Sequence, residues 1–98
     1  MTPEAKVKAD AQKLLAAEGV YYFMPPGVGY GRSGIPDIIA CVNGRFLAVE
    51  CKACKGKPTA LQSRELALIA AAGGVAVILR EDGIEGLREL IQQLKEMT

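Results

Sequence analysis

Two apolar segments flank an Asn-Gly pair near the middle of the chain. Segment 37–42 (DIIACV) precedes Asn43-Gly44, and segment 45–52 (RFLAVECK) follows it. Asn-Gly favours a type I′ turn, because both residues tolerate positive φ angles and the twist of this turn matches that of two antiparallel strands. We therefore predict a β-hairpin with a two-residue turn. Counting outward from that turn decides which side chains of the two strands face each other.

Helices and further strands are predicted on both sides of the hairpin from the spacing of apolar residues. The expected elements are a helix from Pro3 to about Glu18 with Thr2 as its N-cap, a strand over 20–24, a helix over 59–72, a strand over 75–80 and a final helix. This αβββαβα order predicts an α/β fold of three layers, in which helices flank a central mixed sheet. Because residues 75–80 are almost all apolar, we expect their strand to be covered on both faces.

The start of each of the last two helices carries the spacing of a capping box. Thr59 is followed three residues later by Gln62, and Asp82 in the same way by Glu85. In a capping box the first side chain accepts from the backbone amide three residues on, and the later side chain bonds back to the first amide. We therefore expect both helices to begin at these residues, which gives Gln62 a structural role of its own.

The length and composition predict one compact domain over residues 1–98. Hydrophobic residues make up 50% of the chain, yet no run approaches the roughly 20 apolar residues of a membrane span. The N-terminus lacks the apolar core of a signal peptide, and the 3 cysteines cannot all pair within one chain. We therefore expect a cytoplasmic protein with no membrane partner.

The chain contains no histidine, and this absence limits its chemistry. Ser-His and Cys-His nucleophiles and histidine-rich metal sites are excluded, so hydrolysis would depend on carboxylates, Lys, Tyr, Cys or an oxygen-ligated metal. The formal net charge of +1 neither requires nor excludes a nucleic acid, because phosphate binding depends on a local basic patch. The glycine-rich segment 25–34 leads into a strand with no Gly-Lys-Ser/Thr after it, so no nucleotide cofactor is expected.

Three charged residues of the hairpin are predicted to share one face. The turn places Asp37 opposite Glu50, and the two-residue period of a strand brings Lys52 to the same side. Two carboxylates about 5 Å apart repel by roughly 3 kcal/mol at an effective dielectric constant of about 20. Either one acid is protonated or a cation lies between them, and a divalent metal is the usual solution. The alternative is an exposed strand end at which Glu50 and Lys52 form a solvated ion pair.

Such a cluster suits metal-assisted hydrolysis of a phosphodiester bond. A metal held by Asp37, Glu50 and the carbonyl of Cys51 would bind a phosphate oxygen and acidify a water. Lys52 would orient that water or stabilise developing charge. Glu4 lies beside the apolar stripe that its helix is expected to turn toward the sheet. It could join the site through water, or it could complement the dipole of its own helix.

Segments 34–37 (GIPD) and 49–52 (VECK), followed by Gln62, resemble the VRR-NUC branch of the PD-(D/E)XK nucleases. Both motif halves fall on the predicted hairpin, and the order of helices and strands agrees. The resemblance implies a restriction-endonuclease-like fold. The roles that it implies are Asp37, Glu50 and Cys51 as ligands of Mg²⁺ or Mn²⁺, Glu4 as a further acid of the metal site, Lys52 as the catalytic lysine, and Gln62 as a further catalytic side chain.

The resemblance also implies a substrate and an assembly. Family members that stand alone at this size are similar to Holliday-junction resolvases, and they are homodimers from phages or bacteria. By this resemblance the chain would be a structure-selective endodeoxyribonuclease that cuts duplex or branched DNA, in a bacterial cell or a phage-infected host. Cutting two strands needs two active sites and one chain supplies one, so a homodimer is expected.

Basic and polar residues beside the hairpin form a candidate DNA-contacting rim. They are Arg32, Ser33, Lys55, Lys57 and Arg64. Such side chains commonly contact phosphates, although they would equally suit a solvated surface. Tyr30, in the preceding loop, is expected to cover the core or to stack on a base. The rival function is a noncatalytic DNA-binding or protein-interaction domain on the same scaffold.

Overall fold

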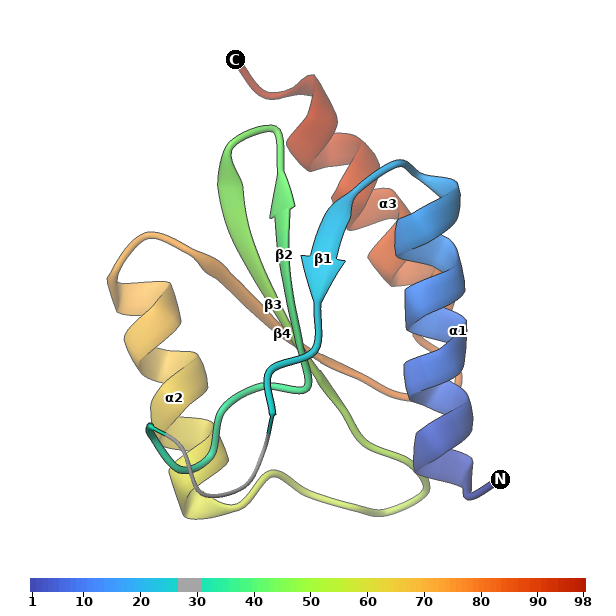
Figure 1. Ribbon diagram of the computed structural model, residues 1–98, viewed down its shortest axis with the longest axis vertical. Coiled ribbons are helices and arrows are strands. Elements are labelled where there is room, and N and C mark those ends of the chain that lie inside the picture. The colour runs from blue at the N-terminus through green and yellow to red at the C-terminus, as the bar shows by residue number, and fades with distance from the viewer. Residues whose placement is uncertain (27–30) are drawn as a thin grey trace.

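The computed structural model describes residues 1–26 and 31–98, which contain helices and strands in the predicted αβββαβα order (Figure 1). The elements are α1 (Pro3–Ala17), β1 (Tyr21–Phe23), β2 (Ile38–Val42), β3 (Arg45–Cys51), α2 (Ala60–Ala71), β4 (Val75–Leu79) and α3 (Ile84–Glu96). Tyr30 lies outside the described residues. None of the described helices has the length and apolar character needed to cross a bilayer.

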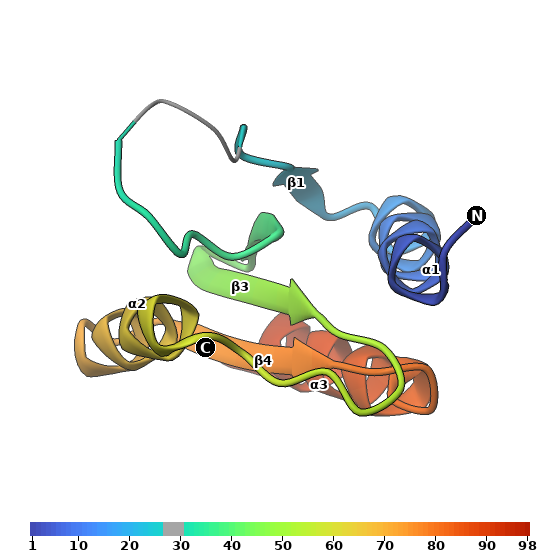
Figure 2. The ribbon, with the colours of Figure 1, turned by 90° about the horizontal axis from the view of Figure 1, so that it is seen from below.

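The described strands form one mixed sheet in the order β1-β2-β3-β4. β2 pairs antiparallel with both β1 and β3, while β4 runs parallel to β3. The helices α1 and α3 lie on one side of the sheet and α2 lies on the other (Figure 2). This arrangement confirms the predicted three-layer α/β fold with a central mixed sheet.

The hairpin has the predicted two-residue turn. Asn43 and Gly44 have φ angles of 53° and 78°, as a type I′ turn requires, and Val42 pairs with Arg45 beside it. The side-chain amide of Asn43 also donates a hydrogen bond of 3.0 Å to the carbonyl of Leu94, in the last turn of α3. One residue therefore shapes the turn and caps the end of a helix.

The predicted register of the hairpin is confirmed from Val42 paired with Arg45 to Ile38 paired with Val49, but the ladder ends one residue short of the predicted pair of Asp37 and Glu50. β2 begins at Ile38, so Asp37 lies in a bend one residue before the ladder. The preceding Pro36 has no amide hydrogen to extend the ladder. The carboxylate of Asp37, rather than its main chain, accepts a hydrogen bond from the amide of Cys51 on the neighbouring strand. The acid therefore reaches β3 through its side chain.

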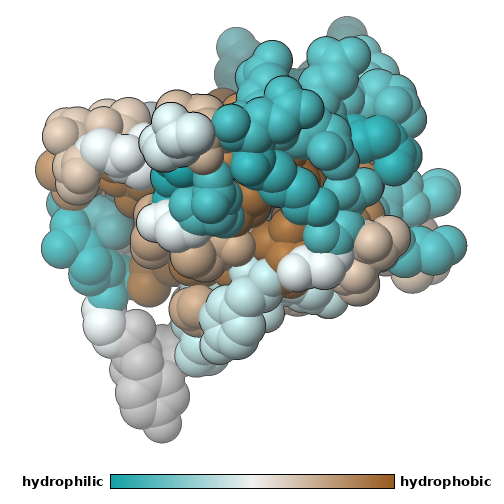
Figure 3. All heavy atoms as spheres, turned by 90° about the horizontal axis from the view of Figure 1, so that it is seen from above, coloured by the Kyte–Doolittle hydropathy of each residue, from teal (hydrophilic) through white to brown (hydrophobic). Residues whose placement is uncertain are grey.

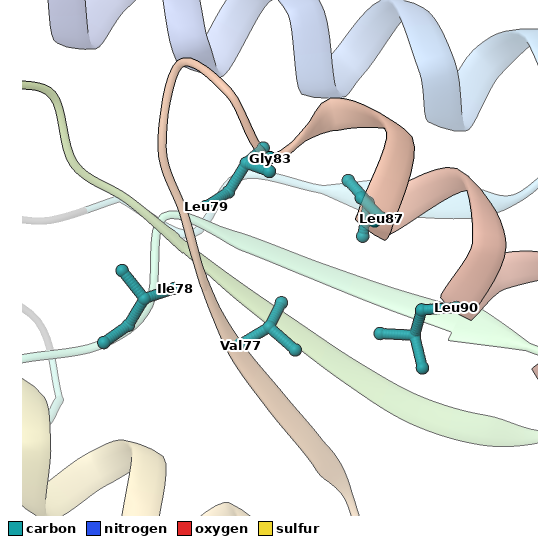
Figure 4. A pocket seen from close by; sticks show the side chains of 7 residues that line it. Val77, Ile78, Leu79, Gly83, Leu87 and Leu90 are labelled. Carbon is teal, nitrogen blue, oxygen red and sulfur yellow. The ribbon is translucent and has the colours of Figure 1, made fainter.

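The hydrophobic core lies between the sheet and the helices α1 and α3. Alternate residues of β2 and β3 point into it, among them Ala40 and Leu47, and α1 contributes Leu15. Along α3, Leu87 and Leu90 line a small apolar cavity of about 200 Å³ together with residues of β4 (Figure 4). The face of the sheet that carries α2 is much less covered, as the exposed fractions below show.

The last strand, which was predicted to lie inside the sheet, is instead at its edge, with α2 packed against one face and Leu87 and Leu90 of α3 near the other. β4 is an edge strand, and the side chain of Ile78 on its α2 side is 43% exposed. An apolar composition indicates that a strand packs against other elements, but it does not distinguish an edge strand from a central one.

The two predicted capping boxes have different outcomes. In α2 the Thr59 side chain accepts from the Gln62 amide, and the Gln62 side chain accepts from the Thr59 amide, so that capping box is confirmed. In α3 the cap residue is Gly83, with no side-chain hydrogen bond, so the predicted box of Asp82 and Glu85 is wrong. Asp82 precedes the cap position, and Glu85 pairs instead with Arg88 along the helix.

Candidate active site

The principal site residues meet at the end of the sheet where β2 begins and β3 ends, in the lower part of Figure 1. Glu50 is the penultimate residue of β3, Lys52 follows its last residue, and Asp37 immediately precedes β2. Glu50 is 2% exposed, whereas the side chains of Lys52 and Asp37 are 13% and 21% exposed. Solvent exposure within the cluster therefore increases from Glu50, which is buried, to Asp37, which reaches solvent.

Asp37 is held from two sides through its two carboxylate oxygens. Oδ2 accepts a hydrogen bond of 2.8 Å from the backbone amide of Cys51. Oδ1 lies 3.5 Å from Nζ of Lys8 on α1. The hairpin and the first helix together fix the orientation of this carboxylate, which lines a cavity of about 330 Å³.

The segment that leads to Asp37 packs against the start of α2, with its backbone very close to that of the helix. Gly34 has a φ angle of +80°, and a Cβ atom at this position would lie 2.5 Å from the carbonyl carbon of Leu61. Only glycine combines that φ angle with that approach. This explains why the GIPD segment begins with glycine: Gly34 lets the segment that precedes Asp37 pack against the helix.

An ion pair links the same segment to α2 one turn further along the helix. The guanidinium of Arg32 donates two hydrogen bonds of 2.9 Å to the carboxylate of Glu65, whose side chain is 8% exposed. The fork geometry of arginine matches a carboxylate in this way. The hydrogen bond from Arg32 is the main reason why the pKa of Glu65 is lowered, and Arg64 contributes at 3.6 Å.

Glu50 carries the least satisfied atom of the site. Its Oε2 lies 3.4 Å from Nζ of Lys52, but its Oε1 is buried without a hydrogen-bond partner among the described residues. Burial, followed by the charge of Asp37, raises the pKa of Glu50, and Lys52 opposes that shift. A buried carboxylate oxygen with no donor is costly. The position of Glu50 is therefore one that a bound cation would stabilise.

Cys51 could contribute a backbone atom to the site as a ligand, but not its thiolate. Its side chain is fully buried on the core face of β3. Burial, with the charges of Asp37 and Glu50, raises the pKa of this thiol to about 12. All three cysteines are free, so Cys51 and Cys54 form no disulfide.

Glu4 and Gln62 stand further from the acids than the hairpin residues do. Glu4 does not point into the core as its helix position suggested, because its side chain is 44% exposed and lies 3.7 Å from Nζ of Lys8. Gln62 lines the same cavity as Asp37, but its Oε1 is occupied by the capping box with Thr59. Lys8 therefore stands between Glu4 and Asp37.

The residues of the candidate rim are all exposed and lie on segments at the same end of the sheet. Lys55 and Lys57 belong to the segment between β3 and α2, which Figure 1 shows crossing the lower edge of the molecule. Arg32 and Arg64 approach from the other side, where both pair with Glu65. The rim thus borders the acids, although its two arginines already have an intramolecular partner.

The donors of the site fit a divalent cation that keeps part of its water shell. In the described part of the chain, no three acid or cysteine side chains gather closely enough to enclose a metal by themselves. Mg²⁺ typically uses one or two carboxylates and retains several waters. Asp37, the unpartnered Oε1 of Glu50 and a backbone carbonyl match that demand.

Sequence reasoning missed two residues of this site. Lys8 carries a charge one helical turn after Glu4, a spacing that signals an ion pair along the helix, but nothing local indicates that Asp37 lies beside it. Glu65 looks like a solvated helix residue in the sequence, and its burial depends on a partner 33 positions away.

The fold and the site together define a class of protein. A mixed sheet flanked by helices, with two acids and a lysine at the end of a hairpin, is compatible with a small nuclease of the restriction-endonuclease-like kind. Comparison with known proteins gives the family. The family described as "Archaeal holliday junction resolvase (hjc)" matches residues 6–78, more than half of the chain, and the chain belongs to it.

A curated relative supports the same class. A protein of Acyrthosiphon pisum secondary endosymbiont phage 1, named "Putative nuclease p44", is 38% identical over 68 residues, which cover 68% of this chain and 69% of that protein. The family and the relative both support a nuclease function. The VRR-NUC branch stays a prediction from the motif spacing, because the matching family is the resolvase family.

Proposed function

We propose that the protein is an endodeoxyribonuclease that uses Mg²⁺ or Mn²⁺ to hydrolyse phosphodiester bonds of branched DNA, such as a four-way junction. The observation that carries the proposal is the buried Oε1 of Glu50, which has no hydrogen-bond partner beside a second acid. A protein that needed this carboxylate only for structure would be expected to satisfy both oxygens. The branched substrate is suggested by the family to which the chain belongs.

Each residue has a distinct part in this proposal. Asp37 and Glu50, with the carbonyl of Cys51, would hold the divalent ion, which when bound neutralises phosphate charge and acidifies a water. Glu50 is fixed by burial and Asp37 by the Cys51 amide, so neither acid has to reorganise. Lys52, 3.4 Å from Glu50, would orient the attacking water or stabilise the charge that develops on the phosphate.

Glu4 and Gln62 would act at the margin of the site. Glu4 reaches it through Lys8 and could hold a water on the metal, while Gln62 borders the Asp37 cavity with its amide nitrogen free of the capping box. Ser33, Lys55 and Lys57 would contact the DNA backbone without reading its sequence.

The proposed assembly is a homodimer, and an exposed apolar surface supports it. Tyr21, Phe23 and Phe46 occupy the α2 face of the sheet and are exposed, and Leu68 of α2 is exposed as well. Figure 3 shows brown and tan side chains over the left and centre of the view, while the hydrophilic ones gather at the upper right. Large apolar side chains that remain exposed on one face of a sheet often belong to a protein interface. A second copy would also supply the second active site that paired cleavage needs.

A cleavage assay tests the activity. Four-way junction, flap, linear duplex and single-stranded DNA are each incubated with Mg²⁺ or Mn²⁺, and we expect the junction to be cut best. Asp37→Asn and Lys52→Ala should abolish cutting without loss of fold, whereas Asp10→Asn and Lys13→Ala, at a half-buried and an exposed residue of α1, should cut normally. Undiminished cutting by Asp37→Asn would refute the site, and DNA binding without cutting by the wild type would favour the noncatalytic alternative.

Sedimentation tests the assembly. The wild type should be a dimer at micromolar concentration, and Phe46→Glu should be a monomer, because a charge would then be buried at the interface. Met97→Glu, at an exposed apolar residue after the end of α3, is the matched control and should remain a dimer. A wild type that sediments as a monomer would contradict the proposal.

A further inference from the structure

We propose that Lys8 is the internal counter-ion of the site: it neutralises Asp37 while no metal is bound, and it turns to a DNA phosphate once a divalent ion takes its place. This inference rests on the proposed function, since it assumes that Asp37 holds the metal. It assigns a role to a residue of α1 that lies outside the hairpin motif.

The position of Lys8 follows from the geometry of three side chains. Its Nζ lies 3.5 Å from Oδ1 of Asp37 and 3.7 Å from Oε2 of Glu4. Glu4 is one helical turn earlier on the same helix, a spacing that holds the ammonium group over the first turns of α1. Glu4 and Asp37 are thus two carboxylates with the ammonium group of Lys8 between them.

The two oxygens of Asp37 show why this ammonium and a metal compete. Oδ2 is occupied by the backbone amide of Cys51, at 2.8 Å. Oδ1 accepts no backbone hydrogen bond and is the more accessible oxygen for a cation, and it is also the atom that Lys8 approaches. A metal on Oδ1 would place a second positive charge within a few ångströms of the ammonium, and like charges at that distance repel.

A displaced Lys8 remains at the site. Its side chain is 31% exposed and lines the same cavity as Asp37, Arg32 and Gln62, so it can turn without leaving the pocket. A flexible ammonium group beside a metal is well suited to contact a phosphate oxygen.

The first test measures metal binding without DNA. Mn²⁺ titrations by calorimetry compare the wild type, Lys8→Ala, Lys8→Arg and Lys6→Ala. Lys6 is the matched control, because it belongs to the same helix and pairs with Asp10, away from the site. Lys8→Ala should bind Mn²⁺ several-fold more tightly than Lys6→Ala, while Lys8→Arg should resemble the wild type. Alanine favours helix, so α1 should stay folded, and circular dichroism checks this.

The second test measures DNA affinity in the Lys52→Ala background, where cutting is not expected. With Mn²⁺ present, Lys8→Ala should bind the junction roughly tenfold more weakly than Lys6→Ala, the effect of one lost charge-assisted phosphate contact. In EDTA the two variants should bind alike, since Lys8 is then engaged by Asp37.

The outcomes separate this role from the proposed function. The role of Lys8 is overturned if Lys8→Ala matches Lys6→Ala in Mn²⁺ affinity, or if the loss of DNA affinity does not depend on Mn²⁺. A wild type that binds no Mn²⁺ at all, with or without Lys8, would instead overturn the metal site itself.

Discussion

The carboxylate of Asp37 accepts a hydrogen bond of 2.8 Å from the backbone amide of Cys51, across the gap where the strand ladder has ended. This bond gives Asp37 a structural task besides its proposed metal ligation. Asp37→Asn keeps an oxygen that can accept from the amide, whereas Asp37→Ala leaves the amide of a buried residue without its partner. We expect Asp37→Ala to lose about 1–3 kcal/mol of unfolding free energy relative to Asp37→Asn. Urea denaturation in EDTA measures the difference, and equal stabilities would show that water replaces the carboxylate.

The buried charge of Glu50 predicts a pH-dependent gain in stability for Glu50→Gln. Because burial raises the pKa of Glu50 in the folded state, the folded protein keeps a proton that the unfolded chain has released. The stability of the metal-free wild type should therefore fall as pH rises from the unfolded pKa through the folded one. Glu50→Gln avoids this cost, so its advantage should be small at acid pH and full above the folded pKa.

Denaturation in EDTA at acid and at neutral pH checks this, with Glu89→Gln, at an exposed residue of α3, as the control. Mn²⁺ should raise the melting temperature of the wild type and not that of Glu50→Gln. A Glu50→Gln protein less stable than the wild type at neutral pH would contradict the argument.

Gly34 offers a test of how the acid is positioned. Gly34 and Gly31 both have positive φ angles, but a Cβ at Gly31 would meet nothing within 4 Å, while one at Gly34 would overlap the backbone of Leu61. Both alanine variants should lose about 1–2 kcal/mol from φ strain. Gly34→Ala should lose roughly 1–3 kcal/mol more and should cut DNA far more slowly, because the segment before Asp37 must move. Denaturation and cleavage assays on the pair decide, and equal losses would show that the contact with α2 is dispensable.

Substitutions in the ion pair of Arg32 and Glu65 test whether Arg32 has a structural role, binds DNA, or does both. Glu65→Gln frees the guanidinium, so it should lower stability at neutral pH but leave DNA affinity unchanged or raised. Arg32→Ala should lower both. Because the pKa of Glu65 is depressed, the stability that the pair contributes is present at neutral pH and is lost as pH falls through the folded pKa. Filter binding and denaturation measure the two effects, and wild-type DNA affinity in Arg32→Ala would make Arg32 purely structural.

Local signals predicted most of the fold because they act over a few residues. The Asn43-Gly44 turn and the Thr59 and Gln62 cap both occur as expected, since each depends on neighbours in the chain. The edge position of β4 could not be predicted in this way, because strand order depends on contacts between segments far apart in sequence. Asp82 failed as a cap for a related reason: the turn before α3 places Gly83 at the cap position.

The site was predictable in its membership more than in its geometry. The period of the strand brought Glu50 and Lys52 together correctly, at 3.4 Å. Asp37 lies one residue beyond the ladder whose register was predicted correctly, and its side chain rather than its main chain accepts a hydrogen bond from β3. Lys8 joins through the packing of α1 against the sheet, for which its local sequence carries no signal.

The bond from Asn43 to Leu94 links the hairpin turn to a helix residue 51 positions later in the chain. A hairpin with a favourable turn closes within microseconds, whereas this bond has to wait until a helix some fifty residues later has docked. We expect a contact made that late to be absent from the transition state, so that Asn43→Ala speeds unfolding more than it slows folding. Asn43, at the end of the hairpin opposite the acids, would thus lengthen the lifetime of the native state by slowing its unfolding.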